Sequence, residues 1–153
     1  MSRILGLDLG ERRIGVAVAD LDGAAVALTT LRRGRHGALD AAAIRRIADE
    51  QGAVEVVVGL PLEASGAEGS QARVTRDWVA VVTPLVRLPV TFRDERLSSH
   101  VAETRLGPMK RGRSGGPPSA AQRDANRARV DREAAAIILQ DELDARARSG
   151  DGR

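Results

Sequence analysis

The sequence predicts an α/β fold in which helices flank a five-stranded mixed sheet. Two observations favour it. Three apolar segments near the N-terminus are joined by short links, as in an antiparallel meander. Segments of helical and strand-like periodicity then alternate along the chain, and strands joined through helices lie parallel to their neighbours. We therefore expect three antiparallel strands followed by parallel additions.

The first three strands are predicted from apolar runs and turns. Residues 3–9 are apolar on both faces, as in a central strand, and apolar residues alternate with small ones over 14–18. A GERR turn joins these two segments. A third strand is expected over 24–31, after an Asp-Gly turn.

The remaining elements follow from a change of period. In order, they are a helix over 38–51, a strand over 54–60, an amphipathic helix through Val74, Trp78, Val81, Val82 and Leu85, a strand over 90–93, a helix ending at Leu106 and a last helix over about 128–147. Residues 107–118 are rich in Gly, Pro and Arg, and we expect a flexible basic loop over about 107–127. The length of 153 residues suggests a single domain over 1–153.

Composition excludes several classes of protein. The chain has no cysteine, which rules out a disulfide scaffold and thiolate chemistry, and its two histidines make a His-rich zinc site implausible. No apolar run approaches the roughly 18 residues of a membrane span. We expect a cytoplasmic protein with no membrane partner.

Three carboxylates lie in positions that need an explanation. Asp8 is inside an apolar strand, where a charge is costly unless it is paired or binds a metal, although turn amides could also satisfy it. Glu95 directly follows a strand, where α/β sheets bind ligands, although a solvated charge cluster fits too. Asp131 falls on the apolar face of the last helix, or stabilises that helix's N-terminus.

The three carboxylates fit one site. Two strands and the last helix can each deliver one of them to the same edge of the sheet. Oxygen-only ligands suit Mg²⁺ or Mn²⁺, and two such ions activate water and stabilise the leaving oxygen of a phosphodiester. This is nuclease chemistry that needs neither cysteine nor histidine.

Four segments together resemble the YqgF/RuvX family, small bacterial relatives of the RuvC Holliday-junction resolvase. In family order they are GLDLGERRIGVAVAD at 6–20, VVGLPL at 57–62, PVTFRDERLSS at 89–99 and RVDREAAAIILQ at 129–140. The resemblance implies an RNase H-like fold. It also implies that Asp8, Glu95 and Asp131 are the catalytic, metal-binding acids of a two-metal nuclease.

The resemblance implies one of two substrates. One role is maturation of the 5′ end of pre-16S rRNA, and the other is resolution of four-way DNA junctions. We expect a monomer or a homodimer, and a dimer if the chain resolves junctions. The expected products carry a 5′ phosphate and a 3′ hydroxyl. The loop at 63–67 reads EASGA where relatives often carry NMDGT. RuvC uses four acids, whereas three map onto this sequence, with Asp94 as a weaker candidate for the fourth.

Basic and hydroxyl side chains supply candidate phosphate contacts. Arg12 and Arg13 follow Asp8 at a turn, where they either contact substrate phosphate or are only solvated. The hydroxyls of Ser98 and Ser99 either bind phosphate or cap a helix. Between residues 105 and 129 the net charge is +6, against +3 for the chain. We expect this basic arm to clamp the phosphate backbone; its central cations are Lys110, Arg111 and Arg113. The scarcity of aromatic residues argues against base stacking.

Two other classes compete with a nuclease. A catalytically silent nucleic-acid-binding module would use the same fold without cleavage. An actin-like ATPase or sugar kinase shares the D-x-G hairpin, but it needs a duplicated domain and a second phosphate loop, for which 153 residues leave no room.

Overall fold

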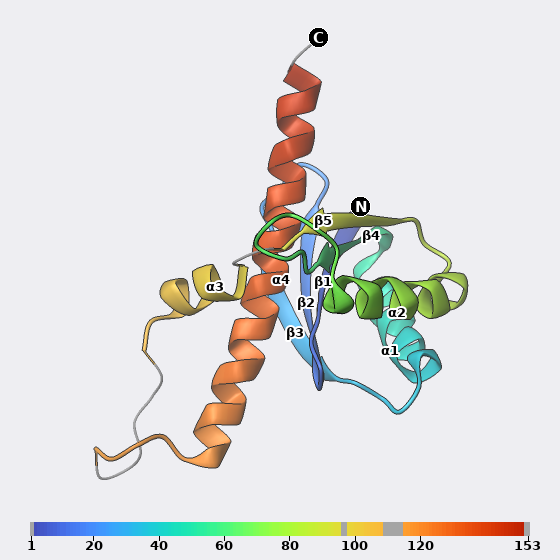
Figure 1. Cartoon of the computed structure of the whole chain (residues 1–153). Coiled ribbons are helices and arrows are strands. Elements are labelled where there is room, and N and C mark those ends of the chain that lie inside the picture. Colours follow the sequence, from blue (N-terminus) through green and yellow to red (C-terminus); the bar gives the residue numbers. More distant parts are fainter. Residues whose placement is uncertain (1, 96–97, 109–114, 152–153) are drawn as a thin grey trace.

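The structure is a computed structural model that describes residues 2–95, 98–108 and 115–151. Figure 1 shows its elements along the chain. They are β1 (Arg3–Leu9), β2 (Arg13–Asp20), β3 (Val26–Arg32), α1 (Gly37–Gln51), β4 (Ala53–Leu60), α2 (Ser70–Val86), β5 (Val90–Asp94), α3 (Ser98–Leu106) and α4 (Ala120–Asp151). This order confirms the predicted succession of strands and helices.

The strands form a mixed sheet in the order β3-β2-β1-β4-β5. The meander of β1, β2 and β3 is antiparallel, whereas β4 pairs in parallel with β1 and β5 pairs in parallel with β4. The predicted architecture is therefore confirmed. Because β1, β4 and β5 run in one direction, their carboxyl ends meet at one edge of the sheet.

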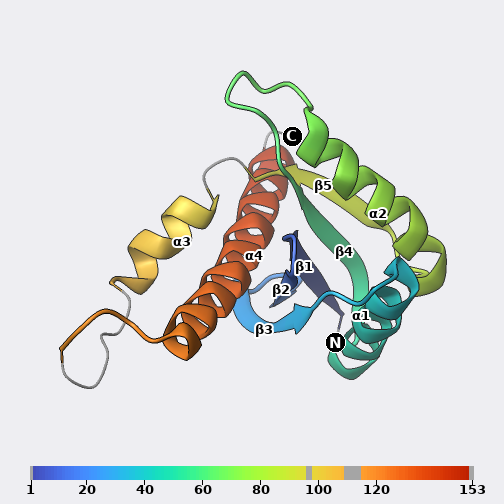
Figure 2. The same cartoon turned by 60° about the horizontal axis from the view of Figure 1, so that its bottom comes forward.

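Side-chain alternation along the strands gives the sheet two different faces. On one face, the aliphatic residues of the strands pack with Ile44 of α1 and Trp78 of α2 in a single core. On the opposite face, Ile4, Ala17 and Val57 pack beneath the apolar part of α4. Figure 2 shows α4 on one side of the sheet and α1 and α2 on the other.

Glycine residues let α4 lie unusually close to the strands. A Cβ atom at Gly6 would stand 2.8 Å from the Cβ of Leu139. A Cβ atom at Gly15 would stand 1.9 Å from the carbonyl oxygen of Asp131, which belongs to the helix backbone and cannot rotate away. Gly15 therefore fixes the point at which α4 crosses β2.

The last helix is longer than predicted, and this shortens the expected loop. The helix begins at Ala120 rather than near residue 128, so residues 120–127 are helical and not part of a loop. Its start is a capping box: the Gln122 amide donates to Ser119 Oγ (3.1 Å), and the Ser119 amide donates to Gln122 Oε1 (2.7 Å). Residues 109–114, within the predicted loop, lie outside the described residues.

The third strand and the second helix also differ in detail from expectation. The strand β3 runs over Val26–Arg32 rather than 24–31. Of the apolar residues predicted to line one face of α2, Trp78 and Val82 are buried, but Val74, Val81 and Leu85 are about half exposed. The buried face of α2 is therefore narrower than its sequence pattern indicates.

The helix α3 packs on α4 rather than on the sheet. Ala102 is fully buried against Val130, Ala134 and Ile137 of α4. Both views show α3 beside the N-terminal half of α4. Within the described residues, no helix has both the length and the apolar character needed to cross a membrane.

Candidate metal centre

Asp8 is a buried carboxylate on the face of the sheet that α4 covers. It lies near the end of β1, opposite Gly15 of β2, and only 8% of its surface is exposed. Burial raises the pKa of Asp8, and the charge of Asp131 raises it further, whereas a hydrogen bond with Glu95 lowers it. The ionised form of Asp8 is therefore poorly compensated by the protein alone.

Glu95 contacts Asp8 from the end of β5, which β4 separates from β1 in the sheet. It directly follows β5, and its amide donates to the carbonyl of Leu60 (3.2 Å), which keeps it aligned with the end of β4. A Cβ atom at Gly59 would lie 2.9 Å from Glu95 Oε2, so the glycine leaves the space that this side chain fills. Burial, the hydrogen bond to Asp8 and the charges of Asp8 and Asp94 raise the pKa of Glu95 to about 10.

The two carboxyl groups therefore share one proton near neutral pH. They are hydrogen-bonded to each other, and burial together with their mutual repulsion disfavours ionisation of both. Two buried acids held together in this way are the arrangement expected of a cation site, because a cation in place of the proton would let both ionise.

Asp131 approaches the same region from α4. Its backbone rests on Gly15, the residue paired with Asp8 across the sheet, and its charge acts on Asp8. Its side chain is 24% exposed, and Oδ2 accepts a hydrogen bond from Arg13 Nε at 2.8 Å. The three acids chosen from sequence thus converge from β1, β5 and α4.

The donor set suits a hard divalent cation. Carboxylate oxygens are the ligands that Mg²⁺ and Mn²⁺ prefer, and two of the three carboxylates are already in contact. Among the described residues, no group of three Asp, Glu, His or Cys side chains has the spacing of a metal-ion site. Asp8 and Glu95 form the contacting pair, and Asp131 bonds Arg13.

Comparison with known proteins decides the family. The profile described as "RuvX: Holliday junction resolvase" matches residues 2–145. The chain belongs to the RuvX family. It is 46% identical over 147 residues to a protein of Anaeromyxobacter dehalogenans strain 2CP-C described as "Putative pre-16S rRNA nuclease", covering 95% of this chain and 98% of that one. A protein of Thermosynechococcus vestitus with the same description is 41% identical over 150 residues, covering 97% and 92%.

Solved structures confirm the fold predicted for this RuvX family member. Thermus thermophilus RuvC superposes with a TM-score of 0.52 at 16% identity, covering 95% of this chain and 96% of that one. The same protein in complex with a Holliday junction substrate gives a TM-score of 0.51, with the same identity and coverage. The fold is RNase H-like, as the resemblance implied.

The arginines of the RuvX hairpin turn have different environments. Arg13 bonds Asp131 and also donates from Nη1 to Asp124 (3.2 Å), so it is tied to α4 rather than free for substrate. Arg12 is exposed, and its carbonyl accepts the amide of Arg33 (2.9 Å). Sequence reasoning treated the two arginines alike, because their difference depends on where α4 lies.

The other predicted phosphate contacts lie beyond what the structure describes. Ser98 and Ser99 open α3, and their side chains are not described; Lys110, Arg111 and Arg113 lie outside the described residues. Their roles stay predictions. In the described part of the basic arm, Arg123 and Arg127 are exposed on α4.

The loop between β4 and α2 is held at both ends in this RuvX chain. Leu62 forms an isolated bridge with Glu68, and Arg76 of α2 makes two hydrogen bonds to Glu68, at 2.5 and 2.9 Å. Arg76 also lies over the ring of Phe92 in β5, 4.7 Å from its centroid. The divergent segment EASGA therefore sits in a loop tied to the end of the sheet.

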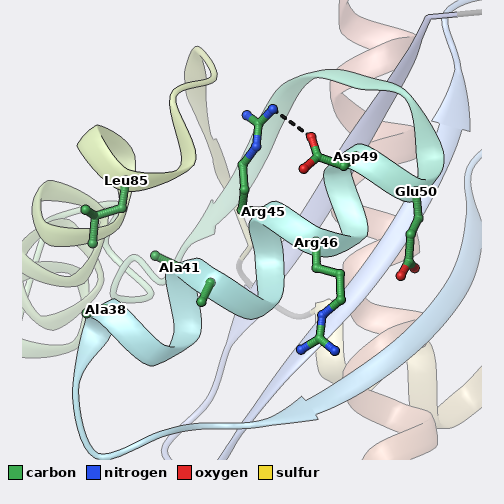
Figure 3. A pocket seen from close by; sticks show the side chains of 8 residues that line it. Ala38, Ala41, Arg45, Arg46, Asp49, Glu50 and Leu85 are labelled. Atoms are coloured by element: carbon green, nitrogen blue, oxygen red, sulfur yellow. Dashed lines mark ion pairs between the residues drawn. The ribbon is translucent and has the colours of Figure 1, made fainter.

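A separate hollow lies on the face of the sheet opposite the acids. It has a volume of about 620 Å³ between α1 and α2 (Figure 3). Its lining comprises Ala38, Ala41, Ala42, Arg45, Arg46, Asp49, Glu50 and Leu85. It contains neither the acid pair nor Asp131, and it is not the candidate metal centre.

Proposed function

We propose that this chain is a divalent-metal-dependent endonuclease that hydrolyses phosphodiester bonds of structured nucleic acid in the cytoplasm. Its first proposed role is maturation of the 5′ end of pre-16S rRNA. The observation that carries the proposal is the buried hydrogen-bonded pair of Asp8 and Glu95, with Asp131 reaching the same region from α4. The description given to its relatives supports the choice of substrate.

The three acids would hold Mg²⁺ or Mn²⁺, in two ions as the nuclease mechanism requires. When bound, the ions supply a polarised water and neutralise charge on the leaving oxygen. Asp8 is the central ligand in this proposal, because it contacts Glu95 and lies within the field of Asp131. The proton that the pair shares would have to leave to solvent before both carboxylates could bind a cation.

The protein contributes position and partial exclusion of water. Gly59 and Gly15 leave the space that lets Glu95 and α4 approach Asp8. Because Asp8 is buried in a central strand, it cannot move independently of the sheet, and the site is built on rigid elements.

The surface near α4 supplies the proposed contacts to nucleic acid. Arg123 and Arg127 are exposed one turn apart on α4, which also carries Asp131. Arg12, Ser98, Ser99 and the cations at 110, 111 and 113 are proposed as further phosphate contacts from the sequence alone. Such contacts read the backbone and shape of a substrate rather than its bases.

Cleavage of end-labelled pre-16S rRNA fragments with Mg²⁺ or Mn²⁺ tests the proposal. The parent chain should cut and leave a 5′ phosphate, and EDTA should stop it. Asp8→Asn and Glu95→Gln should lower turnover by at least about 100-fold while retaining RNA binding. Asp141→Asn is the matched control, because Asp141 is an exposed acid on α4 outside the site. Cleavage by both site variants at the parent rate would refute the site.

Resolution of four-way DNA junctions is the second candidate. The family description and the RuvC fold favour it. Symmetric cleavage of a junction needs two active sites and therefore a dimer. Paired cuts in a four-way junction by a dimeric species would support this function, whereas a strict monomer that cuts only RNA would exclude it. Salt-dependent binding without cleavage of either substrate would indicate a silent binding module.

A further inference from the structure

Arg13 links the candidate metal centre to the N-terminal part of α4. Its Nε donates to Asp131 Oδ2 at 2.8 Å, and its Nη1 donates to Asp124 Oδ1 at 3.2 Å. Asp124 and Asp131 are seven residues apart and therefore lie on the same face of the helix. One guanidinium from β2 thus bridges two turns of α4 beside the place where that helix crosses the sheet.

The geometry leaves Arg13 little freedom. Its side chain is 17% exposed, against 55% for Asp124 and 24% for Asp131, so the guanidinium is the most buried member of the three. A planar guanidinium with two bonds in different directions has a fixed orientation. The contact uses Oδ2 of Asp131, and Oδ1 is left to other partners.

We propose that Arg13 is a positioning residue that orients Asp131 for a divalent cation, with Asp124 anchoring the other end of its guanidinium. This role rests on the proposed function. A carboxylate can accept a hydrogen bond on one oxygen and bind a cation through the other. Partners of this kind fix ligand orientation, and their loss typically costs about 10–100-fold in metal affinity or activity.

A purely electrostatic role for Arg13 predicts the opposite result. If Arg13 acted only as a positive charge, it would repel an incoming cation, and removing it would strengthen metal binding. If it acts by orienting Asp131, removing it weakens metal binding despite the loss of repulsion. The two roles therefore predict opposite signs for the same measurement.

Mn²⁺ binding, measured by titration calorimetry and by the EPR signal of the free ion, supplies that measurement. Arg13→Gln should raise the Kd for Mn²⁺ by at least about 10-fold. Arg13→Lys keeps the positive charge but not the planar guanidinium that makes both hydrogen bonds. It should also bind Mn²⁺ more weakly than the parent. Arg32→Gln is the matched control, since it removes an exposed arginine from the neighbouring strand β3, and its Kd should be that of the parent. Equal or tighter binding by Arg13→Gln overturns the role of Arg13.

Thermal unfolding without metal tests the interaction of Arg13 with Asp131 independently of the proposed function. In EDTA, the midpoint of thermal unfolding is followed through Trp78, the single tryptophan of the chain. Arg13→Gln and Asp131→Asn should each lower it, and the double variant should lose less than the sum of the two. Additive losses overturn the coupling. A parent chain that binds no Mn²⁺ refutes the proposed function, whereas equal binding by parent and Arg13→Gln refutes only the positioning role.

Discussion

The shared proton of Asp8 and Glu95 makes the stability of the metal-free chain depend on pH. The pKa of Glu95 rises from 4.5 to about 10 on folding, chiefly because the side chain is buried. Between these values the folded chain holds a proton that the unfolded chain releases. The contribution of this proton to stability is complete below pH 4.5 and is lost as the pH rises toward 10.

Glu95→Gln should remove this dependence. The glutamine stays neutral and keeps a donor toward Asp8, so the fall in unfolding free energy between pH 6 and pH 9 should flatten by on the order of 1 kcal/mol per pH unit. Urea unfolding in EDTA, followed by Trp78 fluorescence, measures it. Glu50→Gln, at an exposed position of α1, should retain the parent slope. An unchanged slope in Glu95→Gln would show that Glu95 is already ionised in the folded chain.

Single residues differ in how far sequence could predict their roles. Asp8 lies in an apolar strand, and Asp131 falls on the apolar face of a helix. The local sequence pattern alone therefore singles out both carboxylates, because a charge at such a position needs a partner. The bond between Arg13 and Asp131 joins residues 118 positions apart. No local pattern encodes it, because it depends on where α4 crosses β2. The buried bond from Trp78 Nε1 to Asp40 (2.9 Å) was missed for the same reason.

At the scale of elements, the start of α4 shows a limit of reading apolar periodicity. Residues 120–127 have no apolar stripe, and the predicted helix therefore began too late. The usable signal was different: Ser119 and Gln122 have capping-box spacing, and the segment is rich in Ala and Arg, which favour helix. The strands were better predicted, because their apolar runs are short and bounded by turns.

Gly15→Ala should disrupt the contact between α4 and the sheet. The new Cβ atom would overlap the carbonyl oxygen of Asp131, so helix or strand must move. Overpacking of this kind costs about 1–3 kcal/mol or more, and the displaced Asp131 should also lower Mn²⁺ affinity. Urea unfolding and Mn²⁺ titration measure the two effects. Gly150→Ala, a helical position with open space around it, should not destabilise the chain. A parent-like Gly15→Ala would show that α4 does not seat on β2 as described.

At the scale of the whole molecule, the two faces of the sheet have different chemistry. The α4 face carries the three acids together with Arg123 and Arg127, whereas the α1 and α2 face carries the hollow and half-exposed aliphatic residues. Along the sequence the charge is also uneven, because +6 falls between residues 105 and 129 in a chain of net charge +3. A substrate with a phosphate backbone should therefore approach the α4 face, where the acids also lie.

Replacing exposed arginines by glutamine on one face or the other tests this orientation. Arg123→Gln with Arg127→Gln should weaken binding to a four-way DNA junction or pre-16S rRNA fragment in EDTA, and reduce the dependence of log K on log salt by about 1.5, because two phosphate contacts are lost. The matched control is Arg46→Gln with Arg73→Gln, which removes two exposed arginines from α1 and α2. It should keep the parent slope.

The basic arm can be tested in the same titration. Alanine at Lys110, Arg111 and Arg113 should reduce the slope further, since each cation that contacts a phosphate contributes independently to counterion release. A parent slope in this triple variant would limit the phosphate contacts to α4 and the hairpin turn. If the Arg46 and Arg73 variant lost the slope instead, nucleic acid would bind across α1 and α2. The acids would then be separated from the bound backbone by the sheet, and hydrolysis at Asp8 would be excluded, since the scissile phosphate must reach the carboxylates.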